Sequence, residues 1–550
     1  MGVDPITFEV FRNGLVAVAE QMSAIIWRTS FSTIIREMLD YSTAIFDPAG
    51  RIVAQACRIP IHLNSMSRSL RTALVTIDTW RPGDIVVMND PYSGGQHLPD
   101  VQTFMPVFVD DALVAICGTL GHHLDVGGMR PGSYAADATE IYQEGLRLPP
   151  IKLAENGRMN DRLLALIAAN IRQPDKTLGD LRAQTAALEV GAASVRDIVQ
   201  RYGAPAFREY SDETVATSER RMRACLAAMP RGTYAAEACL DDDGVSDEPV
   251  RVAVAVTVGD GEVTVDFTGS SRQRPSPINA TISSTESATY YVVMAVADPT
   301  IPANFGCYEP IRVIAPSGTV VNAELPSPVV GRMAITHTIT NALFAAFASA
   351  LPGRVTAAYY GMSNVHVLSG DHGAGGQRWI FVDIEVGGWG ARAGKDGLDC
   401  YSQGVHNLAN TPIEMVEAVY PLRFTQYELV PDSGGAGAFR GGLGAARDIE
   451  LLDERGALYT QFDHCKIPAF GLFGGRPGAC ADLSVESGGR STRLPSKVSN
   501  HPLRRGDVFR MTTQGGGGYG EPRERDPALI ERDLREGKVT PAAVTREYGR

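Results

Sequence analysis

The sequence lacks any apolar run of the roughly 20 residues that a membrane-spanning helix requires. Its first residues, MGVDPITFEVFRNG, carry Asp4 and Glu9 and no continuous apolar core, so we expect neither a secretory signal nor a transit peptide. Lysine and arginine total 51 against 63 aspartates and glutamates, a net charge of −12 with no basic block, which excludes the usual footprint of a nucleic-acid binder. We therefore expect a cytoplasmic protein that binds neither membranes nor nucleic acids.

Several catalytic and binding motifs are also missing. The eight cysteines are scattered with no CxxC pair, as expected in a reducing compartment, and we interpret them as isolated buried thiols. No G-x-S-x-G nucleophile elbow occurs. The run GGGGYG (515–520) is followed by no Gly-Lys-Ser/Thr, so it is not a nucleotide-binding P-loop, and we expect a turn there.

What is present is enough apolar sequence for a large core, 44% of 550 residues, which suggests three or four structural units. We predict an α+β, multi-unit mixed fold in which helices pack on antiparallel sheets and the C-terminal part is rich in glycine and β-structure. The predicted units are a metal-site α/β unit (1–155), a mainly helical region (156–235), an α+β unit (236–370), a Gly-rich β-rich unit (371–522) and a helical tail (523–550).

Hydrophobic periodicity supports this division. Apolar residues at steps of three and four predict a helix over 5–27, and the turn DPAG between STAIFD and RIVAQ predicts a hairpin near 42–55. Long helical patterns fill 160–230, alternation in VRVAVAVTV and EVTVDFTG predicts antiparallel strands, and the pattern at 280–297 and 334–351 predicts apolar helices. Two short helices are expected on either side of Gly537.

Two polar loops hold the most suggestive chemistry. The segments NDPYSGGQHLPD (89–100) and GHHLDVGG (121–128) follow predicted strands and bring histidines and aspartates close together in sequence. In a turn, His97 and Asp100 can face one point, as ligands of a divalent metal must. Asp90 before Pro91 is also an ordinary turn starter, and the spacing matches no standard zinc motif, so spacing alone leaves a metal site and a plain loop equally open.

Strand parity separates the two adjacent histidines. At the end of a strand, neighbouring side chains point to opposite faces, so His122 and His123 should not both bind one ion. We take His122 as the ligand and expect His123 to pair with Asp125, two residues on, as outer or catalytic groups that can move protons near neutral pH. A further set of carboxylates, Asp137, Glu140 and Glu144, is interpreted as a solvated helical face.

The sequence resembles the hydantoinase B/oxoprolinase family along its whole length. The resemblance is carried by RTSFSTIIREMLDYSTAIFDPAGRIVAQ (28–55), IPIHLNSM (59–66), both polar loops, EGLRLPPIKL (144–153), SPINAT (276–281), APSGTVVNAELPSPVVGR (315–332), GGWGARAGKDGLD (387–399), FRGGLGAARDIEL (439–451) and GGGGYGEP (515–522). The family includes subunits of ATP-dependent N-methylhydantoinase, caprolactamase and acetone or acetophenone carboxylases, and the C-terminal half of fused 5-oxoprolinases.

The resemblance implies a metal site and a partner. Carried over residue by residue, the implied ligands are Asp40, His97, Asp100 and His122, a set that suits Zn, Mn or Fe. Asp40 is invisible to local spacing. The resemblance also implies an A-type subunit that binds ATP and Mg, and a hetero-oligomer with two or more copies of each subunit.

The implied reaction is the ATP-dependent opening of a hydantoin, lactam or 5-oxoproline ring. The partner's ATP would phosphorylate a carbonyl or enolate oxygen, and this chain's site would deliver water or bicarbonate to a small-molecule substrate. The alternative is the substrate-carboxylating subunit of an acetone-type carboxylase, although the chain is compact beside those subunits. A non-catalytic scaffold, a stand-alone metallohydrolase and a purely structural metal also stay open.

Overall fold

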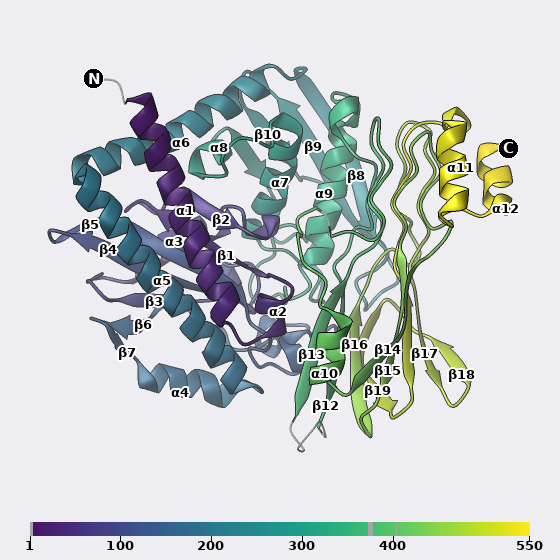
Figure 1. The fold of residues 1–550 in the computed structure, drawn as a ribbon, viewed down its shortest axis with the longest axis horizontal. Helices are drawn as coiled ribbons and strands as arrows, with labels where there is room; N and C mark the ends of the chain where they lie inside the picture. Colours follow the sequence, from purple (N-terminus) through teal and green to yellow (C-terminus); the bar gives the residue numbers. More distant parts are fainter. Residues whose placement is uncertain (1–3, 372–377, 403) are drawn as a thin grey trace.

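The computed structural model describes residues 4–371, 378–402 and 404–550. Helices and mainly antiparallel sheets are combined in it (Figure 1), which confirms the predicted α+β class. Nowhere in these ranges is a helix long and apolar enough to cross a membrane. All eight cysteines are free, but only Cys117 and Cys307 are fully buried, so the expectation of buried thiols is wrong for the other six, which are partly exposed.

The first sheet has seven strands in the order β2-β1-β5-β4-β3-β6-β7. Their bounds are β1 Tyr41–Phe46, β2 Ile52–Cys57, β3 Ile85–Met88, β4 Asp100–Val109, β5 Ala112–His122, β6 Ile151–Glu155 and β7 Arg158–Met159. The predicted hairpin is present as β1 and β2, and β4 turns into β5 at Asp110 and Asp111, both with positive φ. Alternate residues of the strands face opposite sides, which gives the sheet two apolar faces.

Helices cover both faces of this sheet. On one face lie α1 (Pro5–Thr29) and α5 (Pro174–Tyr202), which pack on each other and on β1, β4 and β5. The Asp4 side chain caps α1 by accepting a hydrogen bond from the Thr7 N–H at 2.8 Å. On the other face α3 (Ser65–Thr76) buries Met66, Leu70 and Ala73. The remaining helices of this part are α2 Thr33–Arg36, α4 Asp161–Asn170 and α6 Ala204–Ala227.

The second sheet has four strands in the order β11-β10-β9-β8. Its members are β8 Gly232–Leu240, β9 Val250–Val258, β10 Val263–Asp266 and β11 Ile311–Ile314, with β10 and β11 parallel. The nearly uncharged helices α7 (Ile282–Ala297) and α9 (Met333–Ala348) pack on each other, and α9 packs on β8 and β9. The short helix α8 is Phe305–Tyr308. The start of α9 faces the first sheet, and this junction positions the site described below.

Two further sheets face each other in the C-terminal part. One, in the order β13-β12-β16-β19, contains β12 Asn364–Gly370, β13 Trp379–Glu385, β16 Arg455–Gln461 and β19 Lys497–Arg504. The other, in the order β14-β15-β20-β17-β18, contains β14 Leu422–Leu429, β15 Ala445–Leu451, β20 Val508–Thr512, β17 Asp482–Ser487 and β18 Arg490–Arg493. The helices of this part are α10 Ile413–Val419, α11 Pro527–Arg535 and α12 Pro541–Ala543. The unit boundaries stay predictions, although β12, placed before residue 371, pairs with strands of the last unit.

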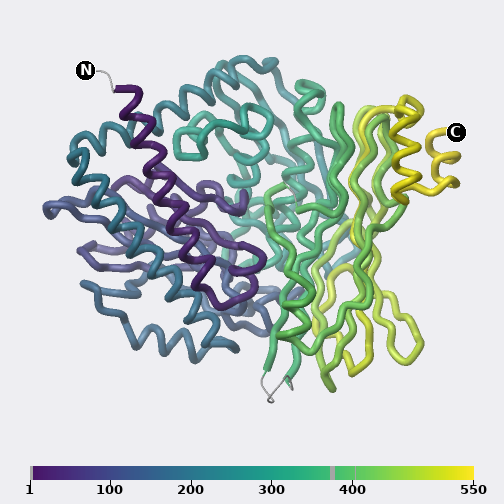
Figure 2. The backbone as a smooth tube through the Cα atoms, viewed as in Figure 1, coloured from purple at the N-terminus to yellow at the C-terminus, as the bar shows by residue number. Residues whose placement is uncertain are grey.

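The glycine-rich runs of this part form a bundle of extended chains (Figure 2), so the expected turn at GGGGYG is wrong for residues 515–518. Gly515 and Gly518 donate hydrogen bonds to the segment 476–479, whereas Gly516 donates to Gly442 and Gly517 to Ala358. Every third residue thus returns to the same neighbour, as in chains of polyproline II type. The chains lie so close that a Cβ on Gly516 would come within 1.9 Å of the Trp389 carbonyl oxygen.

Candidate metal site

Three neighbouring strands of the first sheet end at one edge with polar side chains. Asp40 directly precedes β1, Asp100 opens β4 and His122 closes β5. The antiparallel register places Asp100 opposite His122, and the His122 N–H donates to the Asp40 carbonyl at 3.1 Å. Because the order at this point is β1-β5-β4, the three side chains come from adjacent strands although their positions in sequence are far apart.

The fourth side chain, His97, comes from the loop between β3 and β4. Asp90 starts this loop by accepting a hydrogen bond from the Tyr92 N–H, which is the turn-starter role that the sequence offered for it. His97 then lies with its Nε2 3.0 Å from Asp100 Oδ1, and its ring centroid is 4.9 Å from that of His122. The structure thus brings together Asp40, His97, Asp100 and His122, and all four are buried.

Potential ligand atoms of these residues lie close together. His122 Nδ1 lies 3.5 Å from both Asp40 Oδ2 and Asp100 Oδ1. Asp40 Oδ1, His97 Nε2 and Asp100 Oδ1 are buried without a hydrogen-bond partner. Buried polar atoms without partners are costly, and a divalent cation would satisfy them with two imidazole nitrogens and two carboxylates. His97, Asp100 and His122 are close enough for single ligand atoms of each to share one ion.

Contacts outside the cluster orient its members. The His97 Nδ1 lies 3.2 Å from the Val330 carbonyl, so it carries the proton and leaves the Nε2 lone pair facing the cluster. Arg332, at the start of α9, donates from Nη2 to Asp100 Oδ2 at 2.8 Å and to Gln96 Oε1 at 3.2 Å. Val330 and Arg332 both belong to the part of the chain that holds the second sheet. The geometry of the cluster therefore depends on how the start of α9 packs against the first sheet.

Electrostatics favour the protonation states that a metal needs. Burial, reinforced by the charge of Arg332, lowers the pKa of His97 to about 3, which keeps the imidazole neutral. Burial raises the pKa of Asp100, but the positive charge of Arg332 and hydrogen bonding within the cluster outweigh burial and hold that pKa well below its usual range. A neutral imidazole beside an ionised carboxylate is the pair that binds a cation without first losing a proton.

A fifth side chain, His62, was missed by the sequence reasoning. Its Nε2 lies 3.6 Å from Asp40 Oδ1 and has no hydrogen-bond partner, whereas its Nδ1 lies 2.9 Å from Ser42 Oγ. The residue stands in a short 3-10 turn (Pro60–His62) between β2 and α3. The only signal was its place in the run IPIHLNSM, because no neighbouring acid or histidine marks it in sequence.

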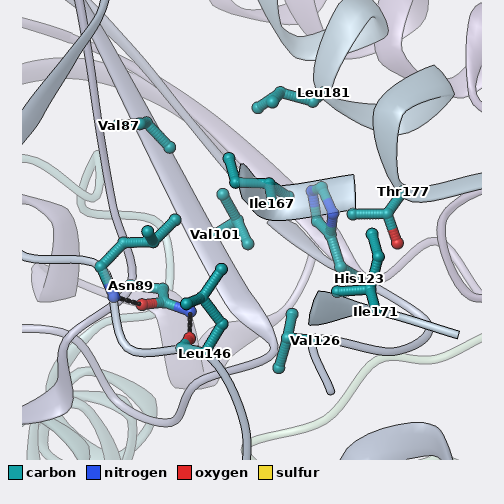
Figure 3. Close-up of a pocket in the computed structure, with 11 residues that line it drawn as sticks. Val87, Asn89, Val101, His123, Val126, Leu146, Ile167, Ile171, Thr177 and Leu181 are labelled. Carbon is teal, nitrogen blue, oxygen red and sulfur yellow. Dashed lines mark hydrogen bonds between the residues drawn. The ribbon is translucent and has the colours of Figure 1, made fainter. Parts of the chain in front are cut away.

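His123 points away from the cluster, toward α5. Its Nε2 lies 2.9 Å from Gln184 Oε1, and its ring faces a small cavity of about 20 Å³ lined mostly by aliphatic side chains (Figure 3). Strand parity therefore separates His122 from His123 in the predicted sense. The predicted pairing of His123 with Asp125 is wrong, because the chain leaves the strand after His122 and parity no longer sets where Asp125 points.

Asp125 instead organises the loop that follows β5. It accepts hydrogen bonds from the Gly127 and Gly132 N–H groups at 3.0 Å each, and Arg172 Nη1 donates to it at 2.9 Å. These are the contacts of a buried ion pair that fixes a loop. The catalytic roles predicted for His123 and Asp125 stay predictions.

The expectation that Glu144 lies on a solvated helical face is wrong. Asp137 and Glu140 are exposed, but the Glu144 side chain is fully buried where a short 3-10 turn (Ile141–Gln143) ends. Its Oε1 accepts a hydrogen bond from the Val330 N–H at 2.8 Å, and Val330 is the residue whose carbonyl contacts His97. Burial raises the pKa of Glu144 to about 8. The helical pattern misled here because the segment folds as loops rather than as a regular helix.

The chain is similar to known proteins along its whole length. The profile of the hydantoinase B/oxoprolinase family matches residues 4–522. The putative B-type subunit of a D-/L-hydantoinase from Pseudomonas sp. strain NS671 is 33% identical over all of this chain and 95% of its own length. The crystal structure of ATP-dependent caprolactamase from Pseudomonas jessenii superposes with a TM-score of 0.94 at 30% identity, covering 100% of this chain and 96% of that one. A nucleotide-free acetone carboxylase structure shares the fold, with a TM-score of 0.92 at 20% identity over 99% of this chain and 79% of that one.

Proposed function

The chain belongs to the hydantoinase B/oxoprolinase family, and from that premise we propose that it is the B-type subunit of an ATP-dependent hydrolase of cyclic amides. Its partner would be an A-type subunit that binds ATP and Mg. The observation that carries the proposal is the buried cluster at one edge of the first sheet, in which His97, Asp100 and His122 offer ligand atoms within reach of one ion and Asp40 Oδ2 lies 3.5 Å from His122 Nδ1. Similarity over full length to a hydantoinase subunit and a caprolactamase favours a hydantoin, lactam or 5-oxoproline ring as substrate.

We propose that these four residues hold Zn, Mn or Fe. When bound, the ion would polarise a carbonyl or lower the pKa of water, as divalent ions do in hydrolases. Neighbouring residues of the chain orient the ligands for the ion. Arg332 holds Asp100 by one oxygen and leaves the other free, and Val330 fixes the tautomer of His97. His123 and Asp125 would act as positioning residues. His123 ties the end of β5 to α5, and Asp125 ties the following loop to Arg172.

The energy for opening an unactivated amide would come from the partner's ATP. Phosphorylation of the amide oxygen makes the carbon electrophilic, and this site would then deliver water to that carbon. The sequence has no P-loop of its own, and the names of the related hydantoinase and caprolactamase chains describe each as one subunit of its enzyme. We propose a hetero-oligomer with two or more copies of each subunit.

The test is to co-express the chain with an A-type subunit from the same genome and to measure ATP hydrolysis with a panel of cyclic amides. We expect amide-stimulated turnover and about one equivalent of a transition metal per chain by elemental analysis. His97→Ala should remove most of the metal and lower turnover at least about 100-fold, in the range of a lost catalytic group. His501→Ala, in β19 and away from the cluster, is the matched control and should change neither.

Other outcomes would reassign the protein. Bicarbonate-dependent turnover with ketones and none with amides would make it a carboxylase subunit, the function named for the second structural relative. Full turnover in the His97→Ala complex would leave only a scaffolding role. Activity of the single chain without ATP would remove the partner from the proposal.

A further inference from the structure

One side chain at the candidate metal site has more hydrogen-bond donors than partners. Arg332 directly precedes helix α9, and its side chain is buried. Its Nη2 donates to Asp100 at 2.8 Å and to Gln96 at 3.2 Å. Its Nε is buried as well but has no hydrogen-bond partner among the described residues. A buried donor without an acceptor costs free energy, so we expect an acceptor at this atom that the chain itself does not supply.

The unpaired Nε lies beside the cluster. Nε and Nη2 are bonded to the same carbon of a planar guanidinium, so Nε is close to the Asp100 carboxylate that Nη2 holds. Burial lowers the pKa of both His62 and His97, and the positive charge of Arg332 adds to this effect, which agrees with a guanidinium close to both rings. An acceptor bound at Nε would therefore be a neighbour of the ion that the cluster would hold.

Helix α9 adds a second positive feature at the same place. It begins at Met333, immediately after Arg332, and no side chain caps its N-terminus. Its first turn contains no acidic residue. The N-terminus of a helix carries about half a positive charge and unpaired N–H groups, both of which attract anions. The start of α9 and the unpaired Nε thus favour the same kind of ligand, an oxyanion.

The charges at the cluster also favour an anionic ligand. Asp40 and Asp100 are its carboxylates, and Arg332 is a cation in contact with one of them. Burial lowers the pKa of His62 and of His97, which keeps both imidazoles neutral. With a divalent ion bound, three positive charges would face two negative ones. A buried excess of positive charge is costly unless an anion neutralises it.

The proposed reaction supplies such an anion. The partner's ATP would phosphorylate the amide oxygen, and water would then attack the amide carbon. The phosphoryl group is therefore attached to the oxygen of the carbon under attack. Guanidinium N–H groups match phosphoryl oxygens in geometry and in charge. A substrate that presents this carbon to the cluster would thus bring its phosphoryl oxygens close to Arg332.

We propose that Arg332 Nε and the start of α9 bind the phosphoryl group of the activated amide beside the cluster. The inference rests on the proposed function. Arg332 acts as a substrate-binding residue: its Nη2 keeps Asp100 in place, while its Nε holds the phosphoryl group and turns the amide carbon toward the cluster. Inorganic phosphate has the same oxygens and charge, so it should occupy the same place and can serve as the probe.

The test uses the complex with the A-type subunit, loaded with Mn²⁺ and free of nucleotide. Inorganic phosphate is titrated while the electron paramagnetic resonance signal of Mn²⁺ is recorded, and the part of the signal that His97→Ala removes is assigned to the cluster. Phosphate should change that part in the unaltered complex. Arg332→Lys keeps a positive charge for Asp100 but lacks the Nε–H, and it should need about 10-fold more phosphate or more, as for one lost hydrogen bond to a charged group.

Amide-stimulated ATP hydrolysis gives a second measurement. Arg332→Lys should lower kcat/KM for the amide about 10-fold or more with the metal content unchanged, and phosphate should compete with the amide. The matched control is Arg505→Lys, because Arg505 is an exposed arginine paired with Glu454, and it should change neither measurement.

Three results would count against the inference or its premise. A Mn²⁺ signal of the unaltered complex that does not respond to phosphate, or equal phosphate titrations of the unaltered and Arg332→Lys complexes, would overturn it. Weaker phosphate binding with unchanged kcat/KM would show that only free phosphate binds, and would overturn the assignment to the activated amide. Failure of the unaltered complex to hydrolyse ATP with any cyclic amide would instead overturn the proposed function, and the phosphate titration would still decide whether the anion site exists.

Discussion

At the scale of single residues, three of the four candidate ligands have a partner outside the cluster. His97 is held by a backbone carbonyl and Asp100 by Arg332, so one nitrogen or oxygen of each is left free. His122 is backed by Tyr134, whose ring is stacked on it at 6.2 Å. Such outer contacts fix tautomers and rotamers before a ligand binds, which lowers the ordering cost of binding.

Glu144 gives a prediction about pH at this scale. Its pKa is raised from 4.5 to about 8, so the folded state keeps a proton that the unfolded state releases between these values. The contribution of Glu144 to the free energy of unfolding therefore falls as pH rises through this window, by about 1.4 kcal/mol per pKa unit. Glu144→Gln mimics the protonated acid and keeps an oxygen for the Val330 N–H.

We compare the free energies of unfolding of the Glu144→Gln and unaltered proteins. The difference in favour of Glu144→Gln should be larger at pH 9 than at pH 5 by a few kcal/mol, which corresponds to about two or three pKa units. Urea unfolding at both pH values measures this difference. Glu155→Gln, at an exposed position of β6, should show no such change. An equal difference between the Glu144→Gln and unaltered proteins at both pH values would contradict the assigned burial effect.

How much of the site was predictable depends on where each residue lies in sequence. His97, Asp100 and His122 stand in loops for which a metal site was one of two open interpretations, and strand parity separated His122 from His123. Asp40 needed the family resemblance, since it lies 57 residues before His97 and only the strand order brings it close. Arg332 comes from another part of the chain, and no local pattern can report contacts that depend on how distant parts pack.

At the scale of elements, periodicity predicted most helices and strands but not the glycine-rich segments. The helix over 5–27, the hairpin near 42–55 and the long helices of 160–230 all appear, because each buries one regular apolar face. Glycine runs have no side chains and therefore no period. Their packing is set by backbone contacts between segments far apart in sequence, as for Gly442, Ala358 and Arg476 around residues 516–518.

This packing predicts a large effect of one methyl group. In Gly516→Ala, the new Cβ would lie 1.9 Å from the Trp389 carbonyl oxygen, and both are backbone-fixed, so neighbouring chains must separate. We expect a loss of about 4 kcal/mol or more, or failure to fold, as for severe overpacking. Soluble yield and urea unfolding measure it. Gly353→Ala, where a Cβ meets nothing within 4 Å, is the control. Equal stability of both variants would contradict the close-packed bundle.

At the scale of the whole molecule, the site lies where two parts of the chain meet. The first sheet and the loops next to its strands supply the four candidate ligands, and the start of α9 supplies Arg332. A separate set of contacts ties the C-terminal sheets to the second sheet. There Asp241 accepts hydrogen bonds from the backbone N–H groups of Cys465, Lys466 and Ile467. The cluster is thus built by the assembled fold rather than by one unit.

A metal that binds only this assembled arrangement must stabilise the whole chain. At a free concentration about 100 times the Kd, mass action contributes about 2.7 kcal/mol to the folded state. We therefore expect chelator-treated protein to gain a few degrees in Tm, about 2–4 °C or more, when Zn, Mn or Fe is restored. Because the four ligands act together, His97→Ala should abolish the gain, whereas His501→Ala should keep it. Calorimetry at fixed protein concentration measures the shift. A gain in Tm of the same size in the His97→Ala protein would show that the ion binds elsewhere in the protein and that the cluster is not the metal site.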